Sequence, residues 1–283
     1  MTSPASLQAK STDAIAAPSA NGWLSQGSAI ALRELRTAVL NRFVPLFSAA
    51  ALAVGIAPLL GEHPDESAPY FLVQAALYLI PLFALLIGVG SAQGDLEERA
   101  FLWTQPVPRL TMVAGKWAAL WGLIFLASCL LVVPSALGGS GACAFAPLCS
   151  LGFSTVAIGG VFLGLGMAIG FSTNDRVKAH LAVLCLWLAL LAGFDLLALA
   201  AVQAGFLHHN ATLWLLILMG NPLDAFRIGT LFSLNQAPLD LAQIPALGQW
   251  WLKHPGAWLA ILSTGWTGAA LGWCWLRLRR MEP

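Results

Sequence analysis

Long apolar runs alternate along this chain with short segments that hold most of its charged residues. A helix that crosses about 30 Å of hydrocarbon needs roughly 20 mostly apolar residues, and six runs reach that length. The pattern therefore predicts an all-α integral membrane protein with six transmembrane helices. These predicted spans cover residues 39–60, 70–92, 111–134, 147–171, 180–202 and 256–276.

The composition of the chain supports a membrane location. Hydrophobic residues make up 58% of its 283 positions and charged residues only 10%, whereas about a quarter of a typical soluble domain is charged. The net charge of +1 gives no reason to expect nucleic acid as a partner. Residues 1–27 are rich in Ser, Ala and Pro and lack a basic head before an apolar core, so we expect a disordered cytoplasmic tail.

The positions of the basic residues predict how the spans are oriented. With the amino terminus in the cytoplasm, only Arg227 and Lys253 of the 14 lysines and arginines fall in outer segments. Basic residues concentrate in the cytoplasmic loops of membrane proteins. We therefore expect a multi-pass membrane protein with both termini in the cytoplasm.

One apolar run does not fit this scheme. Residues 213–219 are too few to cross a membrane, and a seventh span would move the basic carboxyl terminus to the outer side. We therefore expect residues 203–255 to form a long outer segment with one or two interfacial or re-entrant helices.

The fourth predicted span is rich in glycine. Gly160, Gly164, Gly166 and Gly170 form two pairs of small residues, each four positions apart. Such pairs let helix backbones approach closely, so we expect tight helix packing along this span.

A charged segment, GDLEERAFLWTQPVPR at residues 94–109, separates the second and third predicted spans. Gly94 can end the incoming helix, and Asp95 can cap a new one over about residues 95–104. That helix would present acidic and aromatic side chains to the cytoplasm, a surface that suits a protein partner. A solvated loop whose carboxylates neutralise nearby basic residues fits the same composition.

This segment resembles the coupling helix of ABC-2 type transporter permeases, which has the pattern ERE-GT-LL-QPVSR---GK. Residues 97–99 match its charged head, residues 105–109 match its core apart from Pro108, and residues 115–116 match its end. The family's Gly-Thr pair is replaced by Ala100 and Phe101. The resemblance implies that a separate ATPase subunit docks here, on Asp95, Glu97, Glu98, Arg99, Phe101, Trp103, Gln105, Pro106, Arg109 and Lys116.

The same resemblance implies an overall architecture. Residues 28–283 would form one permease domain of the type V exporter kind, with a cytoplasmic amphipathic elbow at residues 31–43 before the first span. Two copies would form a homodimer surrounded by membrane lipids. Residues 115–117, Gly-Lys-Trp, do not form a phosphate-binding loop, so we expect no cofactor in this chain and place ATP and magnesium in the partner ATPase.

Two further stretches resemble the ABC-2 permeases that help to mature the copper-sulfide centre of nitrous oxide reductase. One is GFDLL, around Asp195 in the fifth span, and the other is NPLDAFRIGTL at residues 221–231, which begins at Asn221. This resemblance implies export of a cargo such as a sulfur species, and a beta-helical periplasmic partner. Two alternatives remain open: an ABC-2 exporter of a lipid, glycan or drug, and a membrane scaffold that transports nothing.

Five residues in these two stretches, four polar ones and Pro222, are candidate site residues. A carboxylate at the middle of a membrane costs about 2.5–3.5 kcal/mol, so Asp195 needs a partner or water, either on a transport path or as a structural acid. Asn221 and Pro222 predict the start of a helix, and Asp224 can pair with Arg227 at i, i+3 spacing. That helix is either a stabilised outer element or a gate and docking site for the periplasmic partner.

The cysteines and histidines give weaker signals. Cys143 and Cys149 lie in or beside the loop between the third and fourth spans, on the expected oxidising face, and fit either a disulfide or two free thiols. The five cysteines include no CxxC pair, and the histidines are scattered, so no metal site is predicted. No set of nucleophile, base and acid can be assembled from the sequence, so we expect a transporter subunit and not an enzyme.

Overall fold

A computed structural model describes residues 30–38, 43–60, 64–97, 108–138, 145–205, 211–234 and 246–280. These residues are almost entirely helical and contain no strand, which confirms the all-α fold class. Residues 30–38, which overlap the predicted elbow at residues 31–43, are helical. The helices that follow are α2 (Phe43–Ile56), η2 (Ala57–Leu60), α3 (Pro64–Glu97), α5 (Arg109–Gly138), α6 (Phe145–Ser172), α7 (Arg176–Leu188), η3 (Ala189–Gly193), α8 (Phe194–Gln203), α10 (Ala211–Gly220), α11 (Pro222–Ser233), α12 (Ala246–Lys253) and α13 (Pro255–Arg280).

Each predicted span coincides with a helix, although the helices differ in how well they suit a membrane. Among the described residues, α3, α5, α6 and the continuous helix α7–η3–α8 are long and apolar enough to cross it. Residues 44–60 form a shorter apolar helix. The 26 residues of α13 reach about 39 Å at 1.5 Å per residue, but polar and basic residues dilute its apolar character. Six spans are thus compatible with the structure.

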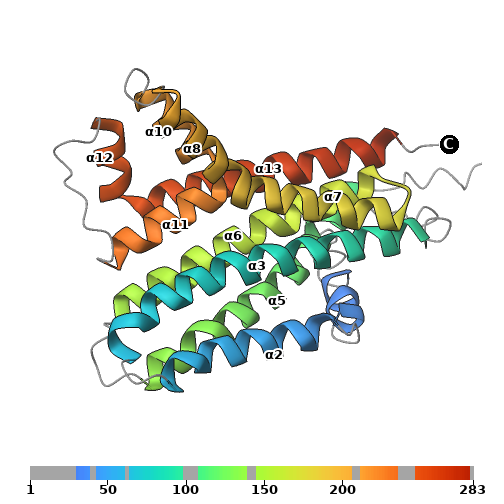
Figure 1. The fold of residues 1–283 in the computed structure, drawn as a ribbon. Helices are drawn as coiled ribbons and strands as arrows, with labels where there is room; N and C mark the ends of the chain where they lie inside the picture. Colours follow the sequence, from blue (N-terminus) through green and yellow to red (C-terminus); the bar gives the residue numbers. More distant parts are fainter. Residues whose placement is uncertain are drawn as a thin grey trace, which may run out of the picture.

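The core of the bundle is centred on α6, which packs against α3, α5 and α13 (Figure 1). Glycines permit the closest approach, as the sequence predicts. A Cβ atom on Gly166 would collide with the backbone oxygen of Leu85 in α3, and a Cβ on Gly88 would lie 2.5 Å from the backbone oxygen of Leu163. Helices α3 and α6 therefore meet backbone to backbone at these glycines.

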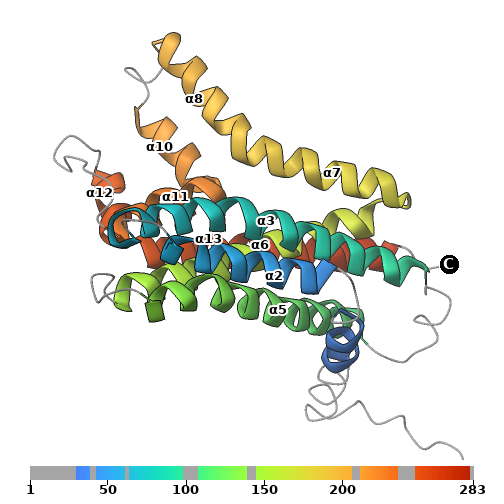
Figure 2. The same cartoon turned by 60° about the horizontal axis from the view of Figure 1, so that its bottom comes forward.

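The helix α7–η3–α8, which we call the arm, leaves the bundle as it rises (Figures 1 and 2). In its most apolar stretch only 6% of the residues are buried, against 61% for α6. The arm packs on α3 and α6 near its start, and its middle turn, η3, is a π-helix. Most of its leucines consequently face away from the protein.

The predicted outer segment contains a sharply bent pair of helices, α10 and α11, whose axes meet at 99°. The bend occurs at Asn221, whose backbone is extended (φ −78°, ψ 118°). Proline disfavours the helical conformation at the residue before it, so Pro222 forces the break. The pair is a broken span or a re-entrant loop, in keeping with the predicted re-entrant element, and α12 adds a third helix.

The predicted boundary at Gly94 is wrong. Helix α3 runs through Gly94 and Asp95 and ends at Glu97. A Cβ at Gly94 would meet nothing within 4 Å, so the glycine marks neither a turn nor a close approach, and Asp95 makes an ion pair with Lys116 in place of the expected helix cap. The rest of the predicted coupling helix, with Glu98, Arg99, Phe101, Trp103, Gln105 and Pro106, lies outside the described residues, as does the predicted tail.

Candidate functional site

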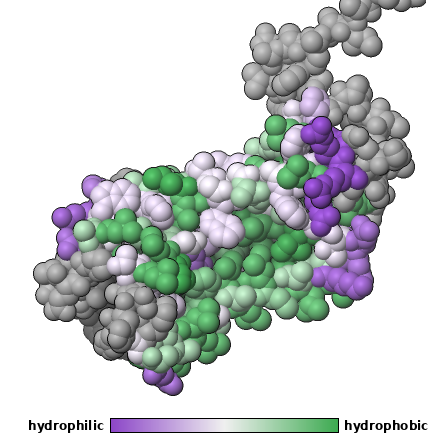
Figure 3. All heavy atoms as spheres, turned by 90° about the horizontal axis from the view of Figure 1, so that it is seen from above, coloured by the Kyte–Doolittle hydropathy of each residue, from purple (hydrophilic) through white to green (hydrophobic). Residues whose placement is uncertain are grey.

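Polar groups are concentrated at the two ends of the bundle, with an apolar surface between them (Figure 3). At one end α3, α6 and α13 finish and α5 and α7 begin. We call this the basic end. Its described basic residues are Arg33, Arg36, Arg109, Lys116, Arg176, Lys178, Arg277, Arg279 and Arg280.

Lys116 is the centre of a buried ion-pair cluster at the basic end. It lies two turns into α5 and is only 3% exposed. Its Nζ is 2.6 Å from Oδ1 of Asp95 on α3 and 3.2 Å from Oε1 of Glu34 in the helix of residues 30–38. The same Nζ donates a hydrogen bond of 3.3 Å to the backbone oxygen of Ser91. One ammonium group therefore joins three helices that are far apart in sequence.

Two further hydrogen-bonding side chains fasten the ends of α3 and α5. Gln93 Nε2 donates to the backbone oxygens of Gly170 (2.8 Å) and Thr173 (2.7 Å), and so binds α3 to the last turn of α6. Arg109 Nη1 donates to the backbone oxygen of Leu278 in α13 at 2.9 Å. Residues 98–107 thus connect two helix ends that are each held to the rest of the bundle.

These contacts change the interpretation of two predicted docking residues. Asp95 and Lys116 lie beneath the surface, 9% and 3% exposed, with their charged atoms turned toward each other. A buried pair suits anchoring better than docking, because a partner protein reaches only surface groups. Gln93 was not singled out by the sequence, although a glutamine near the end of an apolar span is the kind of residue that needs buried partners.

A second polar cluster lies at the bend of the outer segment. Arg227 on α11 places Nη2 3.0 Å from Oδ1 of Asp195 on α8 and Nη1 3.3 Å from Oδ2. Nη2 also lies 3.0 Å from Oδ1 of Asp224. Two-pronged arginine–carboxylate contacts fix geometry as well as charge, so Arg227 holds the arm against α11.

Asn221 completes this cluster and secures the bend. Its side chain accepts from the backbone N–H of Leu223 at the start of α11, and its Nδ2 donates to the carboxylate of Asp224 and to the backbone oxygen of Leu190 in η3 (3.0 Å). Helix α13 adds two indole donors: Trp258 to Met219 (3.0 Å) and Trp266 to Gly220 (3.1 Å), both at backbone oxygens. The last carbonyl groups of α10 are therefore satisfied by tryptophans.

Three predictions for this cluster concern residues that are close together in sequence. The cap at Asn221, the helix start at Pro222 and the pair of Asp224 with Arg227 are confirmed. The partner of Asp195 was missed, although Arg227 is one of only two basic residues in the predicted outer segments. The side chain of Asp195 is 56% exposed beside that of Arg227 at 29%, so the acid lies at the edge of the protein surface.

The remaining candidate residues give no site. Cys149 is a free, exposed cysteine in the second turn of α6, and Cys143 lies outside the described residues, so the disulfide stays a prediction. Within the described ranges, no three side chains of His, Cys, Asp or Glu are grouped as a metal ion would require.

The long apolar helices and the charged groups at the end of the bundle indicate a membrane protein, and sequence comparison identifies its family. The model of the family described as "ABC-2 family transporter protein" matches residues 6–282. The chain therefore belongs to the ABC-2 family of transporter permeases. It is similar to a Pseudomonas aeruginosa protein named "Probable ABC transporter permease protein NosY", with 30% identity over 270 residues, which cover 86% of this chain and 94% of that protein.

Proposed function

We propose that this chain is the permease subunit of an ABC exporter whose ATP and magnesium are bound by a separate, NosF-like cytoplasmic ATPase. The family assignment supports a membrane subunit, and the positive-inside rule favours a cytoplasmic location for the basic end. Residues 95–104 then face the compartment that contains the ATPase. Both termini lie in the cytoplasm, and the chain spans the bacterial inner membrane as a homodimer.

The observation that carries this proposal is the buried cluster around Lys116. A force applied to residues 98–107 has to reach the membrane helices, and a loosely attached loop would absorb it. Here the two flanking helices are joined by Lys116 and Asp95 and are fixed to α6 and α13 by Gln93 and Arg109. Movement of the segment therefore moves α3 and α5 together.

The arm, which the outer cluster ties to α11, is the element that would move in response to this force. Alternating access requires two arrangements of nearly equal free energy. The arm is scarcely buried, and Arg227 and Asn221 tie its upper half to α11. We assign this contact as the outer gate, closed when Asp195 pairs with Arg227. Asp195 then acts as a switching group and not only as a structural acid.

The cargo proposal is based on the relative from Pseudomonas aeruginosa and on the two resembling stretches. We propose export of a species needed to mature the copper-sulfide centre of nitrous oxide reductase, delivered through a NosD-like beta-helical protein docked near α11 and α12. The alternatives are export of a lipid, glycan or drug, and a scaffold that transports nothing.

Affinity co-purification tests the coupling proposal. The whole chain, expressed with its neighbouring genes, is purified, and mass spectrometry names the proteins bound to it. Glu98→Arg and Trp103→Ala should abolish binding of the ATPase, whereas Lys178→Ala, an exposed change at the same end, should retain it. Retained binding with full ATPase coupling in the first two variants would contradict the docking assignment.

A hydrolysis-deficient ATPase separates transport from scaffolding. A transporter must lose reductase maturation when its ATPase binds but cannot cleave ATP. A scaffold should still mature the reductase, and that result would remove the transport function.

A further inference from the structure

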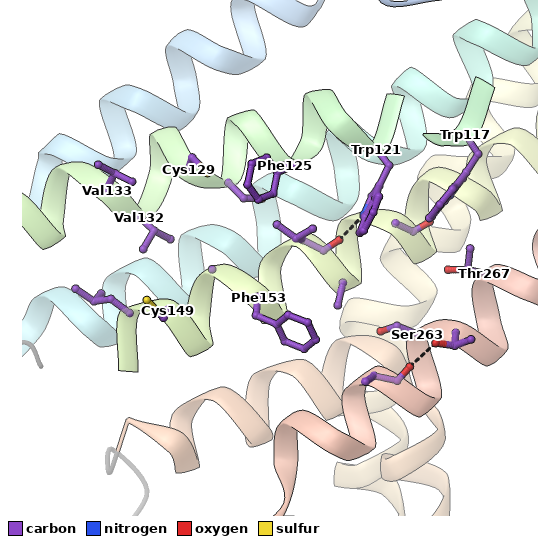
Figure 4. A pocket seen from close by; sticks show the side chains of 18 of the residues that line it. Trp117, Trp121, Phe125, Cys129, Val132, Val133, Cys149, Phe153, Ser263 and Thr267 are labelled. Carbon is purple, nitrogen blue, oxygen red and sulfur yellow. Dashed lines mark hydrogen bonds between the residues drawn. The ribbon is translucent and has the colours of Figure 1, made fainter. Parts of the chain in front are cut away.

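An open apolar groove lies between α5, α6 and α13 (Figure 4). Its volume is about 910 Å³. Helix α5, which forms one wall, lies on the opposite side of the bundle from the arm (Figure 2), so the groove is distinct from the outer cluster. Its lining includes Trp117, Trp121, Phe125, Phe153, Thr267 and Gly268.

The groove extends across most of the thickness of a membrane. Its lining on α5 runs from Trp117 to Ala136, a rise of about 28 Å, close to the 30 Å or so of the hydrocarbon core. Phe125 and Phe153 project into it and are each 55% exposed. In a bilayer these rings require apolar atoms that the described part of the chain does not supply.

The wall of the groove is preformed. Trp117 and Trp121 stack with ring centroids 5.1 Å apart, and each indole N–H donates to a backbone oxygen of α6, at Gly160 and Val156 respectively, both at 3.0 Å (Figure 4). A Cβ at Gly160 would lie 2.9 Å from Trp121 Nε1, so glycine allows the rings to lie flat. Because the N–H groups are satisfied within the protein, the rings offer apolar surface to the groove.

Two arginines, Arg109 on α5 and Arg279 on α13, lie two turns beyond the last lining residues of the groove, toward the basic end. Trp275 and Arg279 follow Gly268 by seven and eleven positions, and therefore continue the same face of α13 beyond the groove. The exposed guanidinium of Arg279 lies 5.4 Å from the ring centroid of Trp275. Arg109 reaches across from α5 to the backbone oxygen of Leu278. Guanidinium groups suit phosphate geometry, and basic pockets between membrane helices on the cytoplasmic side bind anionic headgroups.

We propose that this groove is a binding site for an anionic diacyl phospholipid of the phosphatidylglycerol type. The phosphate lies between Arg279 and Arg109, and the acyl chains lie along Trp117, Trp121 and Phe125. Charge favours a lipid over a second copy of the chain. Two copies in one membrane share their orientation, so a copy seated in the groove would bring its own arginines beside Arg279, and like charges disfavour that contact.

Native mass spectrometry of the delipidated full chain tests this site. The probes are phosphatidylglycerol and phosphatidylcholine with identical acyl chains, and the wild type should bind phosphatidylglycerol more tightly. Gly268→Leu, whose Cβ would point into space free of other atoms within 4 Å, should fill the groove and weaken binding about tenfold, equivalent to 1.4 kcal/mol. Gly265→Leu is the matched control, since it lies on the same helix in open space and does not line the groove.

Two further variants make the result decisive. Arg279→Gln should weaken binding of phosphatidylglycerol about fivefold and leave phosphatidylcholine unchanged. Gly152→Leu repeats the filling of the groove from α6, again with no atom within 4 Å of the new Cβ. Equal retention of the two lipids, or unchanged phosphatidylglycerol binding in both leucine variants, would overturn the proposal. A dimer lost in Gly268→Leu at unchanged lipid occupancy would show instead that the groove holds a second copy. Lipid binding and dimer formation are both measured without the ATPase. A negative result for the lipid site therefore leaves the proposed function intact.

Discussion

Replacement of Lys116 by methionine tests the buried cluster directly. Methionine keeps the unbranched shape and removes the charge, which leaves Asp95 and Glu34 without their shared cation. Removal of one partner of a buried ion pair costs about 3–5 kcal/mol. Since one kcal/mol shifts Tm by about 2–4 °C in a chain of 150–250 residues, Lys116→Met should lower Tm by roughly 6–20 °C.

The control is the exposed pair of Lys178 and Asp175, whose side chains are 77% and 48% exposed and whose charged atoms are 3.8 Å apart. Exposed ion pairs contribute about 0–1 kcal/mol, so Lys178→Met should lower Tm by no more than about 4 °C. Tryptophan fluorescence reports both transitions, because the chain has 12 tryptophans. Asp95→Asn combined with Lys116→Met should be less harmful than the two changes added. A Tm in Lys116→Met equal to that of Lys178→Met would refute the anchoring role.

The remaining predictions concern the outer cluster and the glycine contacts. Arg227→Gln should cost about 3 kcal/mol because it leaves the buried Asp224 without its cation, whereas Asp195→Asn should cost about 1 kcal/mol or less because Asp195 is half-exposed; equal losses of Tm would contradict this order. Cysteines at positions 195 and 227 are separated by about the length of an arginine side chain, too far for a direct disulfide, so a cleavable bifunctional thiol reagent is needed to join them. Under the proposed function this cross-link should hold the gate closed and halt maturation of the reductase until a reductant cleaves it, and unaffected maturation would count against the gate. Gly166→Ala should destabilise by about 1–3 kcal/mol through overpacking against Leu85, while Gly152→Ala in open space should not, as a comparison of thermal unfolding would reveal.

The positions of the helices follow from the sequence because the thickness of a membrane fixes the length of an apolar run. The cap at Asn221 and its pairings within α11 are equally local, and residues three or four positions apart suffice to predict them. The glycines of α6 predict close packing for the same reason. These parts of the structure depend on neighbours in the chain.

The contacts that the sequence did not reveal are those between distant residues. Lys116 meets Glu34 and Asp95 only after three helices have packed together, and Arg227 meets Asp195 only because the chain turns by 99° between α10 and α11. The error at Gly94 has a related cause. Glycine and aspartate in succession favour a helix boundary locally, but packing of α3 on α6 and the charge of Lys116 stabilise one further turn of helix.

Helix α6 and the arm differ in how much of their surface is buried, and this difference determines which of them moves more easily. Displacement of α6 would expose a core in which 61% of the residues of its most apolar stretch are buried, whereas displacement of the arm disturbs a helix with 6%. Buried apolar area contributes roughly 25 cal/mol per Å², so the arm has the smaller barrier. The arm is also connected to the predicted docking segment. Its first helix, α7, packs on α3, and α3 ends at Glu97, directly before residues 98–107. Under the proposed function, a pull at the basic end therefore acts first on the arm, which has the least buried surface to lose, and the ion pair between Asp195 and Arg227 is the polar contact that this movement would break.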